Sequence, residues 1–353
     1  MALAKILKIG PARINSEDIG FAASVLANGG LVIIPTETVY GIAANLNDAK
    51  AMERLFSIKQ RPKDKPFSLH IANKKKVEQY AQDLPVSAYK LMEKFWPGAL
   101  TIILKAKAGG TIGIRFPSNL IAQEIIARAD VPVVCPSANL RGKPAAIDFS
   151  EALEDLSGLV DLAIDSGKTT LGAESTIVDL TVQPPKVIRE GCLKREQIEA
   201  VLSKKSILFV CTGNSCRSVM AEAWLKKNLK EKNRQDVEVS SAGILSSEAT
   251  LASRSTIEIL SREGMDVSGH RGQAVTIDLL KITDLILVME KIHENRILEL
   301  APEVKNRVFL LKEFAKINDS NLDIGDPIGG SEEVYQGTFK VIKAAIERVA
   351  EII

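Results

Sequence analysis

The sequence predicts an α/β protein of two domains, the first built on a twisted sheet and the second on a small, doubly wound parallel sheet. Its 353 residues exceed what a single hydrophobic core usually organises. Short runs rich in β-branched residues alternate with segments of helical periodicity along the chain. Hydrophobic residues make up 46% of the sequence, which is ample for two buried cores.

The first half combines seven expected strands with helices between several of them. The strands are the apolar runs at residues 31–35, 67–71, 100–104, 112–116, 131–135, 175–180 and 186–190. A helix of period 3.6 is expected from Ser16 to Asn28, because Gly29 and Gly30 follow it as a helix-ending pair.

The second half alternates more regularly between strand and helix. Strands are expected at residues 206–210, 237–243, 284–289 and 307–311, with a helix after each and a long helix at the C-terminus. This order implies a parallel sheet with helices on both faces. A polar helical stretch at residues 191–206 separates the halves, so we place the boundary after residue 203, giving domains 1–203 and 204–353.

Composition and termini argue against several classes of protein. A net charge of +2 provides no large basic field for nucleic acid. The N-terminus lacks the apolar core of a signal peptide, and no apolar run is long enough to cross a bilayer. Four cysteines without a CxxC pair suit a reducing compartment. We therefore expect a cytoplasmic protein with no membrane partner.

The segment ILFVCTGNSCRS, residues 207–218, has the features of an anion-binding loop with a reactive cysteine. Its strand brings Cys211 to the carboxyl edge of the parallel sheet, where α/β folds bind ligands. The loop then enters a helix, so backbone N–H groups and the helix N-terminus can surround an anion. Gly213 permits the tight turn, and Asn214 tolerates a left-handed conformation. Arg217 offers two parallel donors to a phosphate, and the same positive field favours a thiolate at Cys211.

A cysteine that attacks a phosphate ester also needs an acid at the leaving group. Asp326, followed by Pro327 and by glycines in an exposed loop, is the candidate. A zinc site would need four ligands, and no His or Cys near Cys211 and Cys216 supplies them. We therefore expect no metal.

These residues resemble the low-molecular-weight protein tyrosine phosphatase family over essentially all of residues 205–353. The matching segments are VCTGNSCRS at 210–218, SAG at 241–243, DLILVM at 284–289 and the Asp-Pro loop near the C-terminus. The resemblance implies that Cys211 forms a phosphocysteine, that Arg217 binds the phosphoryl oxygens, and that Asp326 is general acid and then base. The other phosphate-loop residues are Thr212, Gly213, Asn214, Ser215, Cys216 and Ser218, of which Asn214 and Ser218 orient the loop and the thiolate. No cofactor is implied for this half, and its partner would be a phosphoprotein.

Three positions of this half leave alternatives open. Tyrosine-directed members carry a bulky aliphatic residue where this chain has Ser215, whereas bacterial protein-arginine phosphatases carry a small hydroxyl residue, so Ser215 favours phosphoarginine. Ile328 stands where both branches place an aromatic residue. This chain therefore lacks the ring that would stack on the substrate at that position. Cys216 either forms a protective disulfide with Cys211, as the resemblance implies, or is a small buried residue.

The first half carries polar and basic residues next to its expected strands. Thr36, Thr38 and Tyr40 follow the first strand, and burying their hydroxyls requires partners. A basic run that includes Lys59 and Arg61 is compatible with a solvated surface as well as with phosphate binding. Arg115, in contrast, lies among apolar strand residues, and a buried arginine needs a partner. Together these residues suit a concave site for a polyanion and a small zwitterion.

The same segments resemble the YrdC family, the threonylcarbamoyl-AMP synthases, over roughly residues 8–200. PTETVYG at 35–41, KQRP at 59–62, PGALTIIL at 97–104, PSAN at 136–139 and STIVD at 175–179 appear in the family's order. The resemblance implies synthesis of threonylcarbamoyl-AMP from L-threonine, bicarbonate and ATP, with Mg²⁺ bound to ATP. It assigns L-threonine to Thr36, His70, Arg115 and Ser175, and ATP to Lys59, Arg61, Thr111, Ser137, Asn139 and Arg189. Arg115 would pair with the threonine carboxylate, and Lys59 and Arg61 would contact the phosphates.

The product would pass to a tRNA-modifying transferase complex that attaches the threonylcarbamoyl group to adenosine. Ile147 departs from the family, since many members have threonine there beside the nucleotide. Cys135 and Cys192 are interpreted as small packing residues. Two rival hypotheses stay open: an RNA-binding first half, and a second half that senses redox state through Cys211 and Cys216 without turnover.

Overall fold

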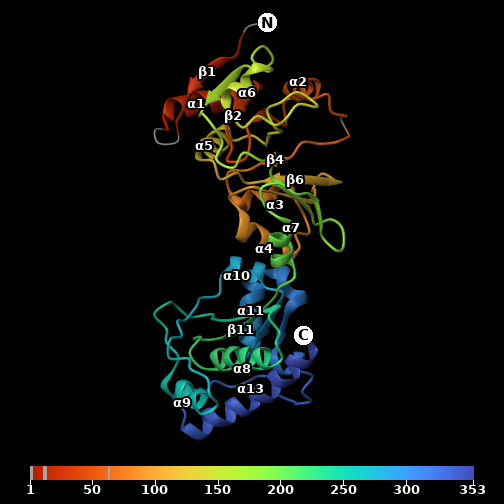
Figure 1. The fold of residues 1–353 in the computed structure, drawn as a ribbon. Helices are drawn as coiled ribbons and strands as arrows, with labels where there is room; N and C mark the ends of the chain where they lie inside the picture. The colour runs from red at the N-terminus through yellow and green to blue at the C-terminus, as the bar shows by residue number, and fades with distance from the viewer. Residues whose placement is uncertain (1–2, 11–13, 63) are drawn as a thin grey trace. The chain divides into compact units, whose positions relative to one another are not determined.

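The computed structural model describes residues 3–10, 14–62 and 64–353. The chain divides into two compact units, Met1–Leu202 and Ser203–Ile353, which are described separately (Figure 1). The predicted α/β class is confirmed in both units. No helix in the described residues is long and apolar enough to span a membrane.

The first unit contains ten strands and seven α-helices among its described residues. The strands are β1 (Lys5–Lys8), β2 (Val32–Ile34), β3 (Gly41–Asn45), β4 (Leu69–His70), β5 (Leu100–Lys105), β6 (Thr111–Arg115), β7 (Val133–Val134), β8 (Leu162–Asp165), β9 (Thr176–Asp179) and β10 (Lys186–Arg189). The helices are α1 (Ser16–Ala27), α2 (Ala49–Lys59), α3 (Val77–Tyr80), α4 (Val86–Phe95), α5 (Leu120–Ala129), α6 (Phe149–Glu154) and α7 (Arg195–Leu202), with a 3₁₀ turn η1 (Lys74–Lys76) before α3.

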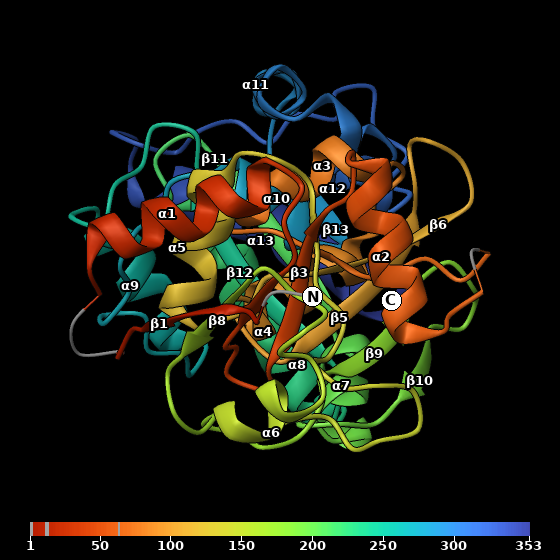
Figure 2. The ribbon, with the colours of Figure 1, turned by 90° about the horizontal axis from the view of Figure 1, so that it is seen from above.

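The ten strands form one mixed sheet in the order β1-β8-β2-β3-β7-β4-β6-β5-β9-β10. Alternate residues of a strand face opposite sides, so both faces of the sheet need cover. Val32 and Ile34 belong to the core under α1 and α5, which lie side by side (Figure 2). Ile33, between them, belongs to the core under α2 and α6. The sheet is therefore sandwiched between helices on both faces.

The second unit has four strands and six α-helices. The strands are β11 (Lys205–Cys211), β12 (Val237–Gly243), β13 (Leu285–Val288) and β14 (Val308–Leu310). The helices are α8 (Arg217–Glu231), α9 (Arg254–Arg262), α10 (Ile277–Ile282), α11 (Lys291–Leu300), α12 (Leu311–Phe314) and α13 (Glu332–Ile352), with a 3₁₀ turn η2 (Pro302–Arg307) before β14.

The four strands are all parallel, in the order β12-β11-β13-β14. Phe209 of β11 packs in the core with α8 and α13, while its neighbour Leu208 packs in the core with α10 and α11. The chain leaves β11 toward β12 on one side and later returns to β13 on the other. This reversal puts the carboxyl end of β11 at the position where doubly wound sheets bind ligands.

Some elements differ from the sequence-based expectation. Strands β1, β3 and β8 were not predicted; β1 is an edge strand whose residues are mostly exposed, so it carries little apolar signal. The polar helical stretch expected between the halves, residues 191–206, does contain a helix, α7, but it is packed into the structure and is not a free linker. Ile198 of α7 is fully buried in the core that includes α4, and β11 already begins at Lys205.

Candidate functional site

In the first unit, three neighbouring strands align His70, Arg115 and Thr101 in one row. His70 of β4 pairs in register with Arg115 of β6, and Thr101 of β5 pairs with Arg115 from the other side. Side chains that are opposite each other in a sheet project from the same face. The row thus places an imidazole, a guanidinium and a hydroxyl side by side.

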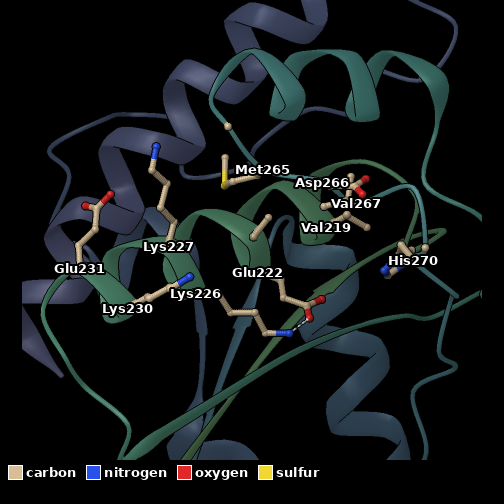
Figure 3. A pocket seen from close by; sticks show the side chains of 13 residues that line it. Val219, Glu222, Lys226, Lys227, Lys230, Glu231, Met265, Asp266, Val267 and His270 are labelled. Carbon is tan, nitrogen blue, oxygen red and sulfur yellow. Dashed lines mark hydrogen bonds and ion pairs between the residues drawn. The ribbon is translucent and has the colours of Figure 1, made fainter.

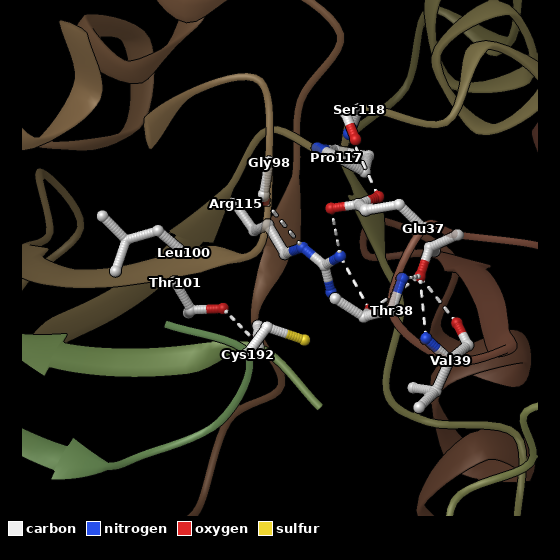
Figure 4. Close-up of polar contacts among 12 residues, drawn as sticks. Glu37, Thr38, Val39, Gly98, Leu100, Thr101, Arg115, Pro117, Ser118 and Cys192 are labelled. Atoms are coloured by element: carbon white, nitrogen blue, oxygen red, sulfur yellow. Dashed lines mark hydrogen bonds and ion pairs between the residues drawn. The ribbon is translucent and has the colours of Figure 1, made fainter. Parts of the chain in front are cut away.

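Arg115 is buried and is held by the turn that follows β2 (Figure 4). Its Nη2 donates to Glu37 Oε1 at 2.7 Å and to Thr38 Oγ1 at 2.8 Å. Glu37 Oε2 accepts the backbone N–H of Ser118 at 3.1 Å, so the carboxylate is also fixed on its far side. The sequence motifs did not single out Glu37, although a buried arginine required such a partner.

His70 lies beside Arg115 and is neutral. Its Nδ1 is 3.3 Å from the carbonyl oxygen of Ser68, which can only accept, so Nδ1 carries the proton and Nε2 is an acceptor. Burial, followed by the charge of Arg115, lowers the pKa of His70 to about 3. The imidazole thus presents an acceptor at neutral pH.

Lys59, at the end of α2, is gathered with two other predicted nucleotide contacts. Its Nζ donates to the carbonyl oxygens of Ser137 and Asn139 at 2.9 and 2.7 Å, and to Asn139 Oδ1 at 2.7 Å. Ser137 Oγ in turn donates to Asn139 Oδ1 at 2.6 Å. Burial lowers the pKa of Lys59 to about 8, against an opposing effect of Glu174. The structure therefore brings these three residues into one cluster.

Arg61 and Arg189 contribute two further guanidinium groups. Arg61 donates to the carbonyl oxygens of Lys65 and Pro66 and lies 5.1 Å from the ring centroid of Phe67. Arg189 of β10 pairs with Glu174 at 2.7 Å and donates to Ser175.

One cavity of about 170 Å³ connects most of the predicted first-unit residues. It is lined by Thr36, Lys59, Arg61, His70, Arg115, Ser137, Ser175 and Arg189. Thr36 Oγ1 caps its own turn by accepting the N–H groups of Thr38 and Val39. Ser175 Oγ is 2.9 Å from Thr101 Oγ1, which joins it to the row on the sheet.

Two predicted contacts do not line this cavity: Asn139 is hydrogen-bonded to Lys59, which does, whereas Thr111 lies apart from it. It begins β6, four residues before Arg115, and its side chain is exposed. Four steps along a strand correspond to roughly 13 Å. Cys135 is buried beside Gly41, in agreement with its predicted packing role, whereas Cys192 is half-buried and its thiol donates a hydrogen bond to the carbonyl oxygen of Ala173.

In the second unit, the loop between β11 and α8 surrounds the Cys211 sulfur. Cys211 is only 2% exposed. Its Sγ accepts the backbone N–H of Asn214 at 3.3 Å and lies 3.0 Å from Ser218 Oγ. These contacts come from the loop and from the first turn of α8.

Asn214 ties the loop to the neighbouring strand β12. It adopts the predicted left-handed conformation, with φ of 53°. Its side-chain amide donates to Ser218 Oγ at 2.9 Å and to Ser241 Oγ at 2.8 Å. His270 Nε2 lies 2.9 Å from its carbonyl oxygen. Gly243 permits this approach, because a Cβ there would lie 2.8 Å from the Asn214 nitrogen.

Arg217 is 1% exposed and is held from several sides. Its Nη1 contacts Glu290 and donates to the carbonyl oxygen of Ile324 at 2.8 Å. Its Nη2 donates to Thr212 Oγ1 at 3.2 Å and to Asp326 Oδ2 at 2.5 Å. Within the described chain, Nε–H is buried without a hydrogen-bond partner. An unpaired buried donor at the start of the helix that follows the Cys211 loop is suited to an anionic ligand.

Glu290 and His293, which the sequence reasoning missed, support this arginine and the loop. Glu290 is the N-cap of α11 and His293 lies in its first turn, and the two form a reciprocal cap. His293 Nε2 is 3.0 Å from Thr212 Oγ1. Burial, followed by the charge of Arg217, lowers the pKa of His293 to about 4. The spacing of Glu290 and His293, three residues apart at a helix start, was the available sequence signal.

Ser215, Cys216 and Ile328 lie around the loop. Ser215 is half-buried, and its Oγ is 3.5 Å from Cys216 Sγ. Cys216 is buried, with Ser253 Oγ and Tyr335 Oη at 3.3 and 3.5 Å from its sulfur. All four cysteines of the chain are free thiols in this structure. Ile328 is 67% exposed, two residues beyond Asp326.

A cavity of about 770 Å³ lies along α8, next to the loop but outside it (Figure 3). Val219, Met265 and Val267 give it apolar walls, and an ion pair of 2.5 Å between Lys226 and Glu222 lies at its edge. It contains neither the thiol nor the Arg217 guanidinium. The reactive groups of this unit are therefore elsewhere. No group of three or more His, Cys, Asp or Glu side chains suited to a metal ion is found in residues 3–10, 14–62 and 64–353.

Comparison with known proteins agrees with the family resemblance noted for each half of the sequence. Residues 24–191 match the Sua5/YciO/YrdC family model, described as telomere recombination, and residues 206–353 match the low molecular weight phosphotyrosine protein phosphatase model. Threonylcarbamoyl-AMP synthase of Pyrococcus abyssi is 38% identical over 218 residues, which cover 59% of this chain and 64% of that protein. The protein-arginine-phosphatase of Geobacillus stearothermophilus is 38% identical over 145 residues, covering 41% of this chain and 93% of that protein.

A solved structure extends this similarity to the fold. P. abyssi Sua5, in complex with L-threonine, matches with a TM-score of 0.54 and 27% identity, covering 86% of this chain and 99% of that one. The chain spans 64% and 57% of the length of the threonylcarbamoyl-AMP synthases of P. abyssi and Bacillus subtilis. The chain thus belongs, through its first unit, to the Sua5/YciO/YrdC family and, through its second, to the low molecular weight phosphotyrosine protein phosphatase family.

Proposed function

We propose that the chain is a bifunctional enzyme that makes threonylcarbamoyl-AMP in its first unit and hydrolyses a phosphorylated protein side chain in its second. The observation that supports the first activity is the polar cavity in which Arg115, the acceptor nitrogen of His70 and the Lys59 cluster meet. The observation that supports the second is the Nε–H of Arg217, which is buried without a partner among the described residues and lies at the start of the helix that follows the Cys211 loop.

In the first unit, L-threonine would lie against the sheet. Its carboxylate would pair with Arg115, and its amino group would donate to His70 Nε2. The cavity of about 170 Å³ is smaller than the roughly 300–1,000 Å³ of sites for drug-sized ligands, which fits an amino acid better than a whole nucleotide. ATP would therefore extend over Lys59 and Arg61, and Mg²⁺ would come with its phosphate oxygens.

The reaction proceeds by two bond-forming steps. The threonine nitrogen attacks the bicarbonate carbon and water leaves, which gives a carbamate. A carbamate oxygen then attacks the α-phosphorus of ATP, and pyrophosphate leaves. Lys59 and Arg61 would stabilise the charge that develops on the phosphates, so catalysis consists of positioning and electrostatics. The product would serve a tRNA-modifying transferase.

The test is pyrophosphate release by the full chain with ATP and Mg²⁺. Release should require both L-threonine and bicarbonate. If RNA binding with steep salt dependence is found and pyrophosphate release does not depend on threonine, the first unit is an RNA-binding module instead.

In the second unit, the thiolate of Cys211 would attack the phosphorus of a phosphate ester or phosphoramidate. Arg217 Nε–H and the loop N–H groups would hold the phosphoryl oxygens. Asp326 would give its proton to the leaving group and then take one from the water that hydrolyses the phosphocysteine. Similarity to a protein-arginine-phosphatase, together with Ser215, favours phosphoarginine over phosphotyrosine as the substrate.

The test is turnover of a small aryl phosphate by the reduced chain. Cys211→Ser should abolish turnover, and acid quenching of the wild type should trap phosphate on Cys211. If the reduced protein neither turns over nor traps phosphate, a redox-sensing role for Cys211 and Cys216 becomes the better explanation.

A further inference from the structure

The hydroxyl of Thr212 receives hydrogen bonds from two donors. Arg217 Nη2, which is always a donor, lies 3.2 Å from Thr212 Oγ1, and His293 Nε2 lies 3.0 Å from the same oxygen. A hydroxyl has two acceptor positions and one hydrogen. If both neighbours donate, the hydrogen of Thr212 must be directed to a third partner.

The capping geometry of α11 makes His293 a donor. The backbone N–H of Glu290 donates to His293 Nδ1 at 3.1 Å, so Nδ1 carries no proton. A neutral imidazole with an unprotonated Nδ1 has its hydrogen on Nε2, and Nε2–H then points at Thr212. The lowered pKa of His293 agrees with this neutral form at physiological pH.

Among the described residues, no acceptor is found for the Thr212 hydrogen. The residue follows Cys211 directly, and its hydroxyl shares Arg217 Nη2 with Asp326. Because both oxygens accept from this one nitrogen, the Thr212 hydroxyl lies near the leaving-group acid. A phosphoryl group held by Arg217 and attacked by Cys211 would offer the acceptor.

We propose that Thr212 donates a hydrogen bond to the substrate phosphoryl group, and that His293 is the positioning residue that fixes the Thr212 hydroxyl as a donor. The proposal rests on the phosphatase function proposed above. Glu290 links Arg217 to His293, because its carboxylate contacts Arg217 and its backbone N–H selects the His293 tautomer. The start of α11 thereby orients two hydrogen-bond donors of the site, the Arg217 guanidinium and the Thr212 hydroxyl.

The experiment measures kcat/KM for a small aryl phosphate and the inhibition constant of inorganic phosphate in variants of the full chain. Thr212→Val removes the hydroxyl while keeping the shape, and should weaken phosphate binding and lower kcat/KM by about tenfold or more, the usual effect of losing a hydrogen bond to a charged group. Thr212→Ser keeps the hydroxyl and should stay close to wild type. Thr283→Val is the matched control, since among the described residues its hydroxyl donates only to the carbonyl oxygen of Leu279, at the end of α10.

The role of His293 is tested by coupling to Thr212. His293→Leu should cause a similar loss in the wild-type background and little further loss on top of Thr212→Val, whereas His293→Gln, which can accept from Glu290 and donate to Thr212, should restore most of the activity. Imidazole ¹⁵N resonances should place the proton of His293 on Nε2, which does not depend on how well the Leu variant folds.

The outcomes distinguish a failure of the role given to Thr212 and His293 from a failure of the phosphatase function. An active wild type with an unchanged inhibition constant in Thr212→Val, a proton on Nδ1, or fully additive losses would overturn this inference alone. A wild type that neither hydrolyses the ester nor binds phosphate would overturn the phosphatase function as well.

Discussion

Each of the two units buries an arginine next to its reactive groups, and a carboxylate holds each one. Glu37 contacts Arg115, and Glu290 contacts Arg217. Removing one partner of such a pair leaves an uncompensated buried charge, which costs more than the pair itself contributes. Substitutions at these arginines therefore need variants that separate substrate binding from stability.

For Arg115, we expect Arg115→Ala to raise the KM for L-threonine far more than the KM for ATP. The reason is that the guanidinium would pair with the threonine carboxylate, while the phosphates would lie near Lys59. Steady-state pyrophosphate release at varied concentrations of each substrate measures both values. The double variant Arg115→Ala with Glu37→Gln is the control, since it removes the unpaired carboxylate; equal increases in both KM values there would assign Arg115 to the scaffold.

At the other site, we expect Asp326→Asn to slow hydrolysis of an unactivated phosphate ester by about a hundredfold or more, the usual contribution of a general acid. Its side chain is 33% exposed, so the carboxyl can reach a leaving group as well as Arg217. Asparagine keeps a similar shape but cannot transfer the proton. An activated aryl ester, whose leaving group needs no proton, should be affected much less. Similar losses on both esters would indicate a binding role.

Ser215 is the residue for which we expect a change in substrate preference rather than in rate. A small, half-buried hydroxyl leaves room for a planar phosphoguanidinium, whereas Ser215→Ile would fill that space with an aliphatic wall. The ratio of kcat/KM for phosphoarginine to that for phosphotyrosine should therefore fall in the variant. A ratio that does not change would show that this position does not set specificity.

At the level of elements, the sequence predicted positions best where a strand consists of a continuous run of apolar residues. β11 and the start of α8 were placed from residues 207–218 alone, because strand, loop and helix follow without a break. Contacts from distant elements were harder to foresee. The support that α11 gives to Arg217 joins residues 73 positions apart, and no local pattern encodes such a distance. The edge strand β1 was missed because of its local composition. Its exposed Lys5 and Lys8 are typical of a loop rather than of a buried strand.

The start of α11 also leads to a prediction about pH. An unfolded histidine titrates near 6.5, whereas the folded pKa of His293 is about 4. As the pH falls from about 6.5 to 4, the unfolded chain binds a proton that the folded unit does not, so the second unit should lose stability over this range. His293→Gln cannot titrate and should flatten that part of the curve.

The measurement uses the melting temperature followed by tryptophan fluorescence. The chain has two tryptophans, Trp96 in the first unit and Trp224 in the core of the second, so a Trp96→Phe background reports on the second unit. This matters because His70, whose pKa is also lowered by burial, destabilises the first unit over a similar range. Parallel curves for wild type and His293→Gln would contradict the assignment.

At the scale of the whole molecule, the two units have separate hydrophobic cores and separate sheets. The end of the first unit is a packed helix: Ile198 of α7 is buried with α4, and the strand that follows belongs to the second sheet. A cut between α7 and β11 therefore removes no strand from either sheet. A cut a few residues earlier would instead take away part of the core around α4.

We accordingly expect residues 1–203 to fold alone and to retain threonine-dependent pyrophosphate release. Residues 1–190, which lack α7, should be less stable, because Ile198 and its neighbours Val201 and Leu202 would no longer cover the core around α4. Thermal unfolding and pyrophosphate release of the two fragments provide the comparison, with the full chain as reference. If 1–203 is insoluble or inactive while the full chain is active, the first unit depends on the second; if 1–190 matches 1–203, α7 is a linker after all.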